Sequence, residues 1–254
     1  ATYADTDPYV VQQIVELGGP VHADRLRTAA DLILARHRHL GAAFRPLGDG
    51  SLAAVVADAA LRVPWHYDDL SGVEPGAARR RLEDLAEQQR TRPFDLADPP
   101  LMRYALVRLG ADRHVLIQTV HHIIADGWSV PIVLRELTTL HDDPGSTRLP
   151  APAPYLDYLG WIADAPKDAA LDAWRAALDT VCEPTRLADA LPPSRSGRAG
   201  FGRVGTELPA DLAAGITAWA NGRGVTVGAV LGAAWGIAVG RLTGRTDVVF
   251  GSTV

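Results

Sequence analysis

The chain has 254 residues, of which 47% are hydrophobic and 22% charged, so it is an ordinary globular sequence long enough to bury a sizeable core. Its formal net charge of −5 excludes a general electrostatic attraction to nucleic acid or to an anionic membrane. The single cysteine excludes an internal disulfide framework and is typical of a reducing compartment, so we expect a cytoplasmic protein.

The first part of the chain alternates between strand-like and helix-like patterns. Residues 9–17 alternate as a strand, and residues 22–40 carry apolar side chains at helical spacing. Two short strands are predicted over 52–57 and 61–66, and a second helix over 75–90.

The middle of the chain predicts a β-hairpin followed by a helix. Residues 101–109 and 114–121 are apolar, strand-like runs joined by a short Gly-Ala-Asp turn. Residues 132–140 then return to helical spacing. This order of elements predicts an α+β fold, an α/β sandwich in which helices pack on a largely antiparallel sheet.

The second part is divided by stretches rich in Pro, Gly and Ser. Residues 142–154 form a connector before two helices predicted over 155–162 and 168–178. The strongest boundary candidate is the loop that begins near residue 184. The elements expected after it are a strand, two helices and a final strand, at residues 202–208, 210–221, 225–242 and 247–254.

These patterns predict three parts along the chain. They are an N-terminal lobe over residues 1–183, an inter-lobe loop over 184–201, and the beginning of a second lobe over 202–254. The chain has no initiator Met and stops inside a strand-like segment. We therefore expect a fragment of a longer protein.

The segment HHIIADGWS, from His121 to Ser129, is the strongest functional candidate. It follows a strand-like run and precedes a helix-like run, and strand alternation sends the side chains of His121 and His122 to opposite faces. One histidine should therefore face an open site while the other packs behind it. Asp126 and Gly127 are typical of a tight turn. A histidine at a strand end, beside a turn that aims backbone N–H groups, suits acyl-transfer chemistry.

This segment resembles the HHxxxDG motif of the condensation domains of non-ribosomal peptide synthetases. These domains share a superfamily with chloramphenicol acetyltransferase. Residues 36–44 resemble the family's RHxxLRxxF segment, and residues 92–103 resemble its PFDL and PLxR segments. Residues 247–254 resemble the strand that opens its next motif, so the likeness covers nearly the whole chain.

The resemblance implies a chloramphenicol acetyltransferase-like lobe and the start of a second, similar lobe. It also implies an enzyme that forms an amide bond between a donor thioester and the amine of an acceptor thioester. Both substrates would be held on phosphopantetheine arms of carrier proteins, so we expect no cofactor or metal bound directly to this chain. The implied partners are upstream and downstream peptidyl carrier proteins and a neighbouring adenylation domain.

The same resemblance assigns roles to five residues. His122 is the catalytic candidate, either accepting a proton from the amine or orienting it. His121 is expected to be structural because its side chain points away from the site. Asp126 is expected to shape the turn through an ion pair with Arg36, although a solvated Asp and a surface Arg fit the spacing equally well. Gly127 either offers its N–H to the reacting carbonyl or permits the turn.

Two other functions stay open on the sequence. One is a related acyltransferase that uses coenzyme A, or an epimerisation domain with the same histidine motif. The other is a non-catalytic lobe that docks a carrier protein. Gly41 keeps them open because it stands where the family often has a second arginine.

Overall fold

The computed structural model describes residues 7–56, 60–191 and 205–252. The chain divides into two compact units, Ala1–Ala163 and Asp164–Val254. The expected inter-lobe loop, residues 184–201, lies within the second unit, and its residues from 192 onwards are outside the described ranges. The division at residue 184 therefore stays a prediction.

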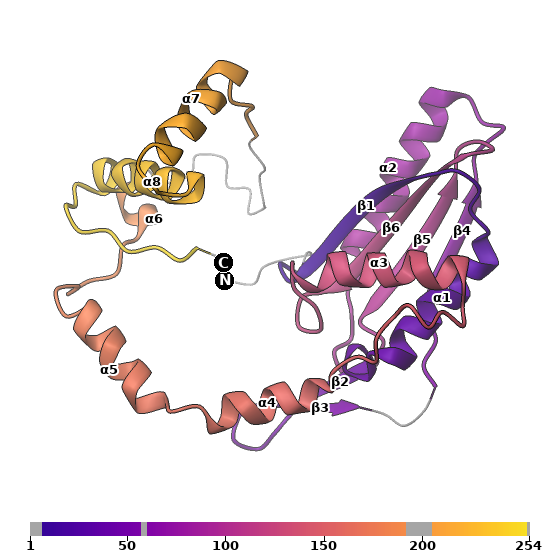
Figure 1. Cartoon of the computed structure of the whole chain (residues 1–254), viewed down its shortest axis with the longest axis horizontal. Coiled ribbons are helices and arrows are strands. Elements are labelled where there is room, and N and C mark those ends of the chain that lie inside the picture. Colours follow the sequence, from indigo (N-terminus) through magenta and orange to yellow (C-terminus); the bar gives the residue numbers. More distant parts are fainter. Residues whose placement is uncertain (1–6, 57–59, 192–204, 253–254) are drawn as a thin grey trace. The chain divides into compact units, whose positions relative to one another are not determined.

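The first unit is built on a four-stranded sheet (Figure 1). The strands are β1 (Val10–Gly18), β4 (Trp65–Asp69), β5 (Met102–Arg108) and β6 (Arg113–His121), in the order β1-β6-β5-β4. β6 pairs antiparallel with both β1 and β5, and only the β4–β5 pair is parallel. The predicted hairpin and the largely antiparallel sheet are confirmed.

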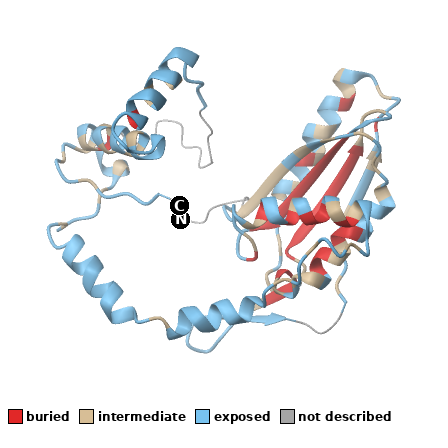
Figure 2. Ribbon diagram, in the orientation of Figure 1, coloured by how far each residue is buried: buried red, intermediate tan, exposed pale blue. Residues whose placement is uncertain are grey.

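Helices cover both faces of this sheet, and its central strands β5 and β6 are the most buried part of the unit (Figures 1 and 2). The helices α1 (Ala23–Arg36) and α3 (Ser129–Asp142) share a core with Leu106 and Leu116 of the sheet. The helix α2 (Pro75–Thr91) packs Ala86, Leu82 and Leu85 on the opposite face, against Ala105, Val115 and Ile117. Neighbouring strand residues thus face different helices, as the pleat requires.

Two predicted elements of this unit differ from the observed ones. The first predicted helix, over 22–40, ends at Arg36, and a 3-10 turn over Arg38–Gly41 follows it. The strand predicted over 61–66 begins only at Trp65, because Asp31 of α1 accepts the Val63 N–H at 2.9 Å and takes that group out of a sheet ladder. A small hairpin of β2 (Ala42–Pro46) and β3 (Leu52–Val56) stands apart from the main sheet.

The remaining helices are α4 (Tyr155–Asp164), α5 (Lys167–Ala177), α6 (Leu187–Ala190), α7 (Ala210–Asn221) and α8 (Val227–Thr243). All of the predicted helices in this part are confirmed. The predicted strands are not confirmed, because residues 205–208 and 247–252 have no strand conformation and residues 202–204 and 253–254 lie outside the described ranges. No described segment of the second unit offers them a partner, and a strand without a neighbour leaves its backbone groups unpaired.

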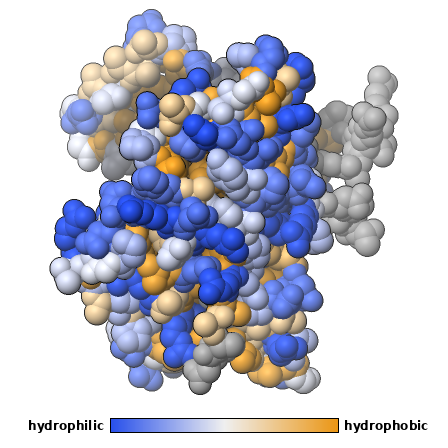
Figure 3. Space-filling model, turned by 90° about the vertical axis from the view of Figure 1, so that its right-hand side faces the viewer, coloured by the Kyte–Doolittle hydropathy of each residue, from blue (hydrophilic) through white to orange (hydrophobic). Residues whose placement is uncertain are grey.

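Figure 3 shows one face of the molecule, on which hydrophobic side chains are scattered among hydrophilic ones. Of the helices that can be described, none combines the length and the hydropathy needed to cross a bilayer.

Candidate active site

The end of β6 places two adjacent histidines in opposite surroundings. His121 is the last residue of the strand and is 4% exposed, whereas His122 begins the following turn and is exposed. The His122 backbone N–H donates to the Tyr9 carbonyl at 2.7 Å, which ties the turn to the start of β1. Its imidazole makes no hydrogen bond to any residue that the structure describes, so both ring nitrogens are open to a substrate.

Hydrogen bonds and aromatic rings enclose the imidazole of His121. Its Nδ1 accepts the Ile123 N–H at 3.1 Å, and its Nε2 lies 3.1 Å from Asp7 Oδ2. The rings of Phe94 and Tyr9 pack at centroid distances of 6.3 and 6.1 Å, Phe94 edge to face. This environment suits a structural role for His121, which stays a prediction.

The buried side chain of Arg103 packs on Phe94, one of the rings that contact His121. The guanidinium of Arg103 lies 3.9 Å from the centre of the Phe94 ring and donates to the carbonyls of Gln89 and Arg92. Burial, together with the charge of Arg92, lowers the pKa of Arg103 to about 10, so the group keeps its charge at neutral pH. The segment over 92–103 therefore contributes to the site through packing.

Asp126 and Ser129 form a hydrogen-bonded turn where the helix that follows the motif begins. Asp126 Oδ1 accepts the Ser129 N–H at 2.8 Å and the Ser129 hydroxyl at 2.6 Å, while the Asp126 N–H lies 3.4 Å from the same hydroxyl oxygen. This reciprocal arrangement resembles a capping box, but it lies in the turn before α3, whose N-cap is Trp128. The hydrogen bonds from Ser129 lower the pKa of Asp126.

The predicted ion pair between Asp126 and Arg36 is wrong. Arg36 instead donates from Nε to Glu136 Oε2 at 3.1 Å and from its Nη2 to the Pro150 carbonyl at 2.8 Å. His37 Nε2 lies 2.8 Å from the same Glu136 oxygen. Asp126 needs no cation because the exposed turn and Ser129 already satisfy its carboxylate.

Glu136 therefore joins α1 to α3. It is 6% exposed, on the face of α3 that also buries Val133, Leu137 and Leu140. Burial opposes its ionisation, but the hydrogen bonds from His37 and Arg36 outweigh burial and lower the pKa of Glu136. The segment over 36–44 thus positions the helix that begins at the motif.

The two glycines singled out in the sequence have different environments. Gly127 does not have a positive φ, and a Cβ there would meet no atom within 4 Å. Its backbone N–H has no hydrogen-bond partner among the described residues, so it is an available donor in the turn that follows His122. At Gly41 a Cβ would lie 2.8 Å from Leu61 Cδ1, so the arginine common in the family would displace that side chain.

Two contributors to the site were missed in the sequence. Glu136 could have been found, because it is the one acidic residue among the buried positions of its helix, Val130, Val133, Glu136, Leu137 and Leu140. Asp7 could not, because a lone Asp before a strand is an ordinary feature of turns. No group of three or more potential metal ligands lies among the residues whose positions are described.

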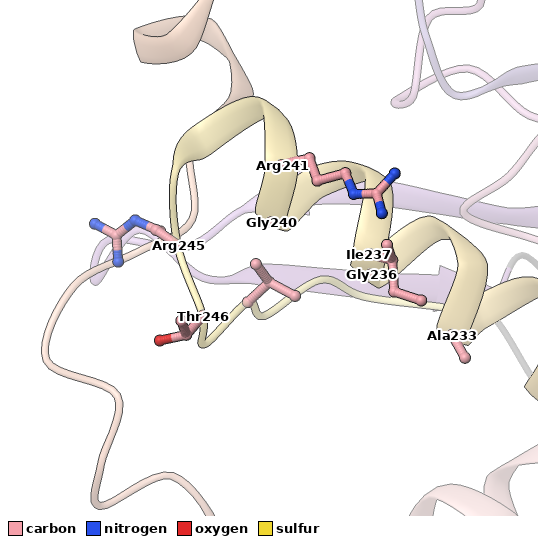
Figure 4. Close-up of a pocket in the computed structure, with 8 residues that line it drawn as sticks. Ala233, Gly236, Ile237, Gly240, Arg241, Arg245 and Thr246 are labelled. Atoms are coloured by element: carbon pink, nitrogen blue, oxygen red, sulfur yellow. The ribbon is translucent and has the colours of Figure 1, made fainter.

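A surface hollow elsewhere contains none of these residues. It lies along α8 in the second unit and is lined in part by Gly236, Gly240, Arg241 and Thr246 (Figure 4). A Cβ at Gly240 would approach the Arg245 carbonyl to 2.9 Å. Glycine at this position thus allows the chain after α8 to lie against the helix.

The α+β lobe and its strand-end histidine define a chloramphenicol acetyltransferase-like fold. The chain belongs to the condensation domain family: the family model described as Condensation domain matches residues 2–254. Bacitracin synthase 3 of Bacillus licheniformis is 30% identical over 251 residues, which cover 97% of this chain and 4% of that synthase.

Solved structures give the same result. The first condensation domain of the calcium-dependent antibiotic synthetase, in complex with a substrate analogue, is 25% identical with a TM-score of 0.65, covering 94% of this chain and 56% of that one. SgcC5 of Streptomyces globisporus shares the fold with a TM-score of 0.75 at 23% identity, covering 96% and 57%. The chain thus spans just over half of these structures and a small share of the synthase.

Proposed function

We propose that this chain takes part in amide-bond formation within a longer non-ribosomal peptide synthetase. The amine of an acceptor aminoacyl thioester attacks a donor peptidyl or aminoacyl thioester, and the donor is transferred to the acceptor. The observation that carries this proposal is the exposed, uncommitted imidazole of His122 at the end of β6, in a member of the condensation domain family.

The chemistry makes modest demands on the protein. A thioester is an activated acyl donor, and an α-amino group has a pKa of about 7.7–8.0, so part of it is unprotonated near neutral pH. His122 orients the amine and accepts its proton as the C–N bond forms and the C–S bond breaks. The available N–H of Gly127 is suited to stabilise negative charge on the carbonyl oxygen.

The partners follow from the same proposal. Upstream and downstream peptidyl carrier proteins deliver the two substrates on phosphopantetheine arms, and a neighbouring adenylation domain loads the acceptor. The similarity to bacitracin synthase 3 supports this setting, because the match covers a small part of a much longer synthase. The cofactor stays with the carriers, and the reaction takes place in the cytoplasm.

The test is His122→Ala in the intact synthetase. Product should fall by about 10²–10⁴-fold, the range for loss of a general base, while loading of both carriers is unchanged. His66→Ala is the matched control, because His66 is also exposed but lies on the far strand β4. Undiminished product in the His122 variant would contradict the assignment.

The same assay separates the alternative functions. Loss of an isotopic label from the donor α-carbon without amide formation would identify an epimerisation domain. Transfer to free coenzyme A would identify a related acyltransferase. Carrier binding with none of these reactions would identify a docking lobe.

A further inference from the structure

The segment before β1 holds the turn that carries the two histidines. Asp7 Oδ1 accepts the Tyr9 N–H at 2.9 Å, and the Asp7 carbonyl accepts the Val10 N–H at 3.2 Å, so this corner is a hydrogen-bonded turn. The other carboxylate oxygen of Asp7 reaches His121 Nε2, and the Tyr9 carbonyl accepts the His122 N–H. One short segment therefore contacts both histidines.

These contacts fix the tautomer of His121. The Ile123 backbone N–H can only donate, so the Nδ1 atom that it contacts must be unprotonated. The ring proton is then on Nε2, where Asp7 Oδ2 accepts it. The Ile123 N–H thus donates to the ring of His121, and that ring donates to Asp7. Ile123 and His121 are the two chain neighbours of His122.

We propose that Asp7 is a positioning residue for His122. By fixing the tautomer of His121, its carboxylate keeps the acceptor nitrogen aimed at the Ile123 N–H, and this bond closes the turn on which His122 stands. The described hydrogen bonds of Asp7 go to Tyr9, Val10 and His121, so Asp7 acts on His122 through His121. The inference rests on the proposed function for its effect on turnover, but the tautomer itself can be measured without any reaction.

The first measurement uses the unaltered chain with 15N-labelled histidine. A long-range 1H–15N spectrum distinguishes a protonated ring nitrogen from an unprotonated one. We expect His121 to carry its proton on Nε2 and the Ile123 amide to be protected from hydrogen exchange. The opposite tautomer would overturn the proposal without any variant having to fold.

The second measurement uses Asp7→Asn. The asparagine oxygen can still accept the Tyr9 N–H, but an amide NH₂ now faces His121 Nε2 and needs an acceptor there. We expect the ring proton to move to Nδ1, and the Ile123 amide to lose its protection because two N–H groups then face each other. Asp49→Asn is the matched control, since Asp49 accepts the Ser51 N–H at 2.9 Å in the same local geometry without a histidine.

Turnover is measured in the intact synthetase with both carriers loaded. Asp7→Asn should lower kcat by about 10- to 100-fold with little change in KM, as expected when a supporting group is lost. Asp7→Glu should recover part of the rate, and Asp49→Asn should match the unaltered enzyme. If His122→Ala abolishes product but Asp7→Asn leaves kcat unchanged, the positioning role is wrong and the proposed function stands. If His122→Ala is fully active, the proposed function is wrong, whatever the tautomer.

Discussion

At the scale of single residues, the position of the strand end separates His121 from His122. Both have the same chemistry and are neighbours in sequence, but β6 ends between them. The last strand residue is enclosed by Asp7, Tyr9 and Phe94, while the next one enters a turn where nothing described covers it. The end of a strand can therefore separate an enclosed imidazole from an exposed one in adjacent residues.

The Glu136 cluster makes a prediction about acid stability. Glu136→Gln should lower the free energy of unfolding at neutral pH by about 1–3 kcal/mol, because Arg36 and His37 lose a buried carboxylate partner. The pKa of Glu136 is below its ordinary 4.5 in the folded state, so its stabilising effect is complete above that value and is lost as the pH falls through the folded pKa. Denaturant unfolding of both proteins across pH should show the difference shrinking below about pH 4.5. A difference independent of pH would contradict the role of the carboxylate.

A second prediction concerns a buried polar pair on the neighbouring strands β5 and β6. Gln118 Nε2 donates to the Tyr104 hydroxyl at 2.7 Å, and burial raises the pKa of this phenol. Tyr104→Phe should destabilise the protein by about 1–3 kcal/mol, because it leaves the Gln118 donor unsatisfied. Adding Gln118→Leu should recover part of this loss, since Gln118 Oε1 already lacks a partner among the described residues. Strictly additive effects in thermal unfolding would show that the two side chains are not coupled.

At the scale of elements, the start of α3 depends on the hydrogen bonds between Asp126 and Ser129 and not on an ion pair. Ser129→Ala should destabilise the protein by about 0.5–1.5 kcal/mol, because the hydroxyl's hydrogen bond to Asp126 is lost. It should also raise the pKa of Asp126 towards its ordinary 3.8, because the Ser129 hydroxyl is the largest cause of the lowered value. NMR titration of the Asp126 carboxyl measures this. Arg36→Ala should leave that titration unchanged, and a shift there would restore the ion pair that the structure replaces.

Most elements could be predicted from the sequence because their patterns are local. The helices and the central hairpin follow from apolar spacing and turn residues, and their observed bounds differ by a few residues. The strand predicted at 61–66 and the Asp126–Arg36 pair failed because a distant side chain decided each one. Asp31 accepts a hydrogen bond from the Val63 N–H, and Glu136 forms the ion pair with Arg36. No sequence pattern identifies such long-range partners.

At the scale of the whole molecule, the two units differ in how much apolar surface they bury. The first has a continuous core on both faces of its sheet. Among the described residues of the second, only Ala220 and Val239 are buried, while Trp219, Trp235 and Phe250 are exposed. Burial on this small scale does not offset the conformational entropy of an ordered chain.

This difference predicts how the separate pieces behave. Residues 1–163 expressed alone should unfold in one cooperative transition, whereas residues 164–254 alone should show none. Differential scanning calorimetry of the two pieces tests this directly. A sharp transition in residues 164–254 would contradict this prediction, because it would show that these helices fold cooperatively despite their small buried apolar surface.

The open side of β1 has a consequence for the protein in solution. β6 pairs with one side of this strand, and no described strand pairs with the other, so a row of backbone donors and acceptors remains available. Such a row is a template for any extended peptide, including the same strand of a second molecule. Glu16 is the one charged residue of β1, and its charge opposes that contact. Preparations of this chain should therefore self-associate as their concentration rises, and a dilution series followed by light scattering would reveal it.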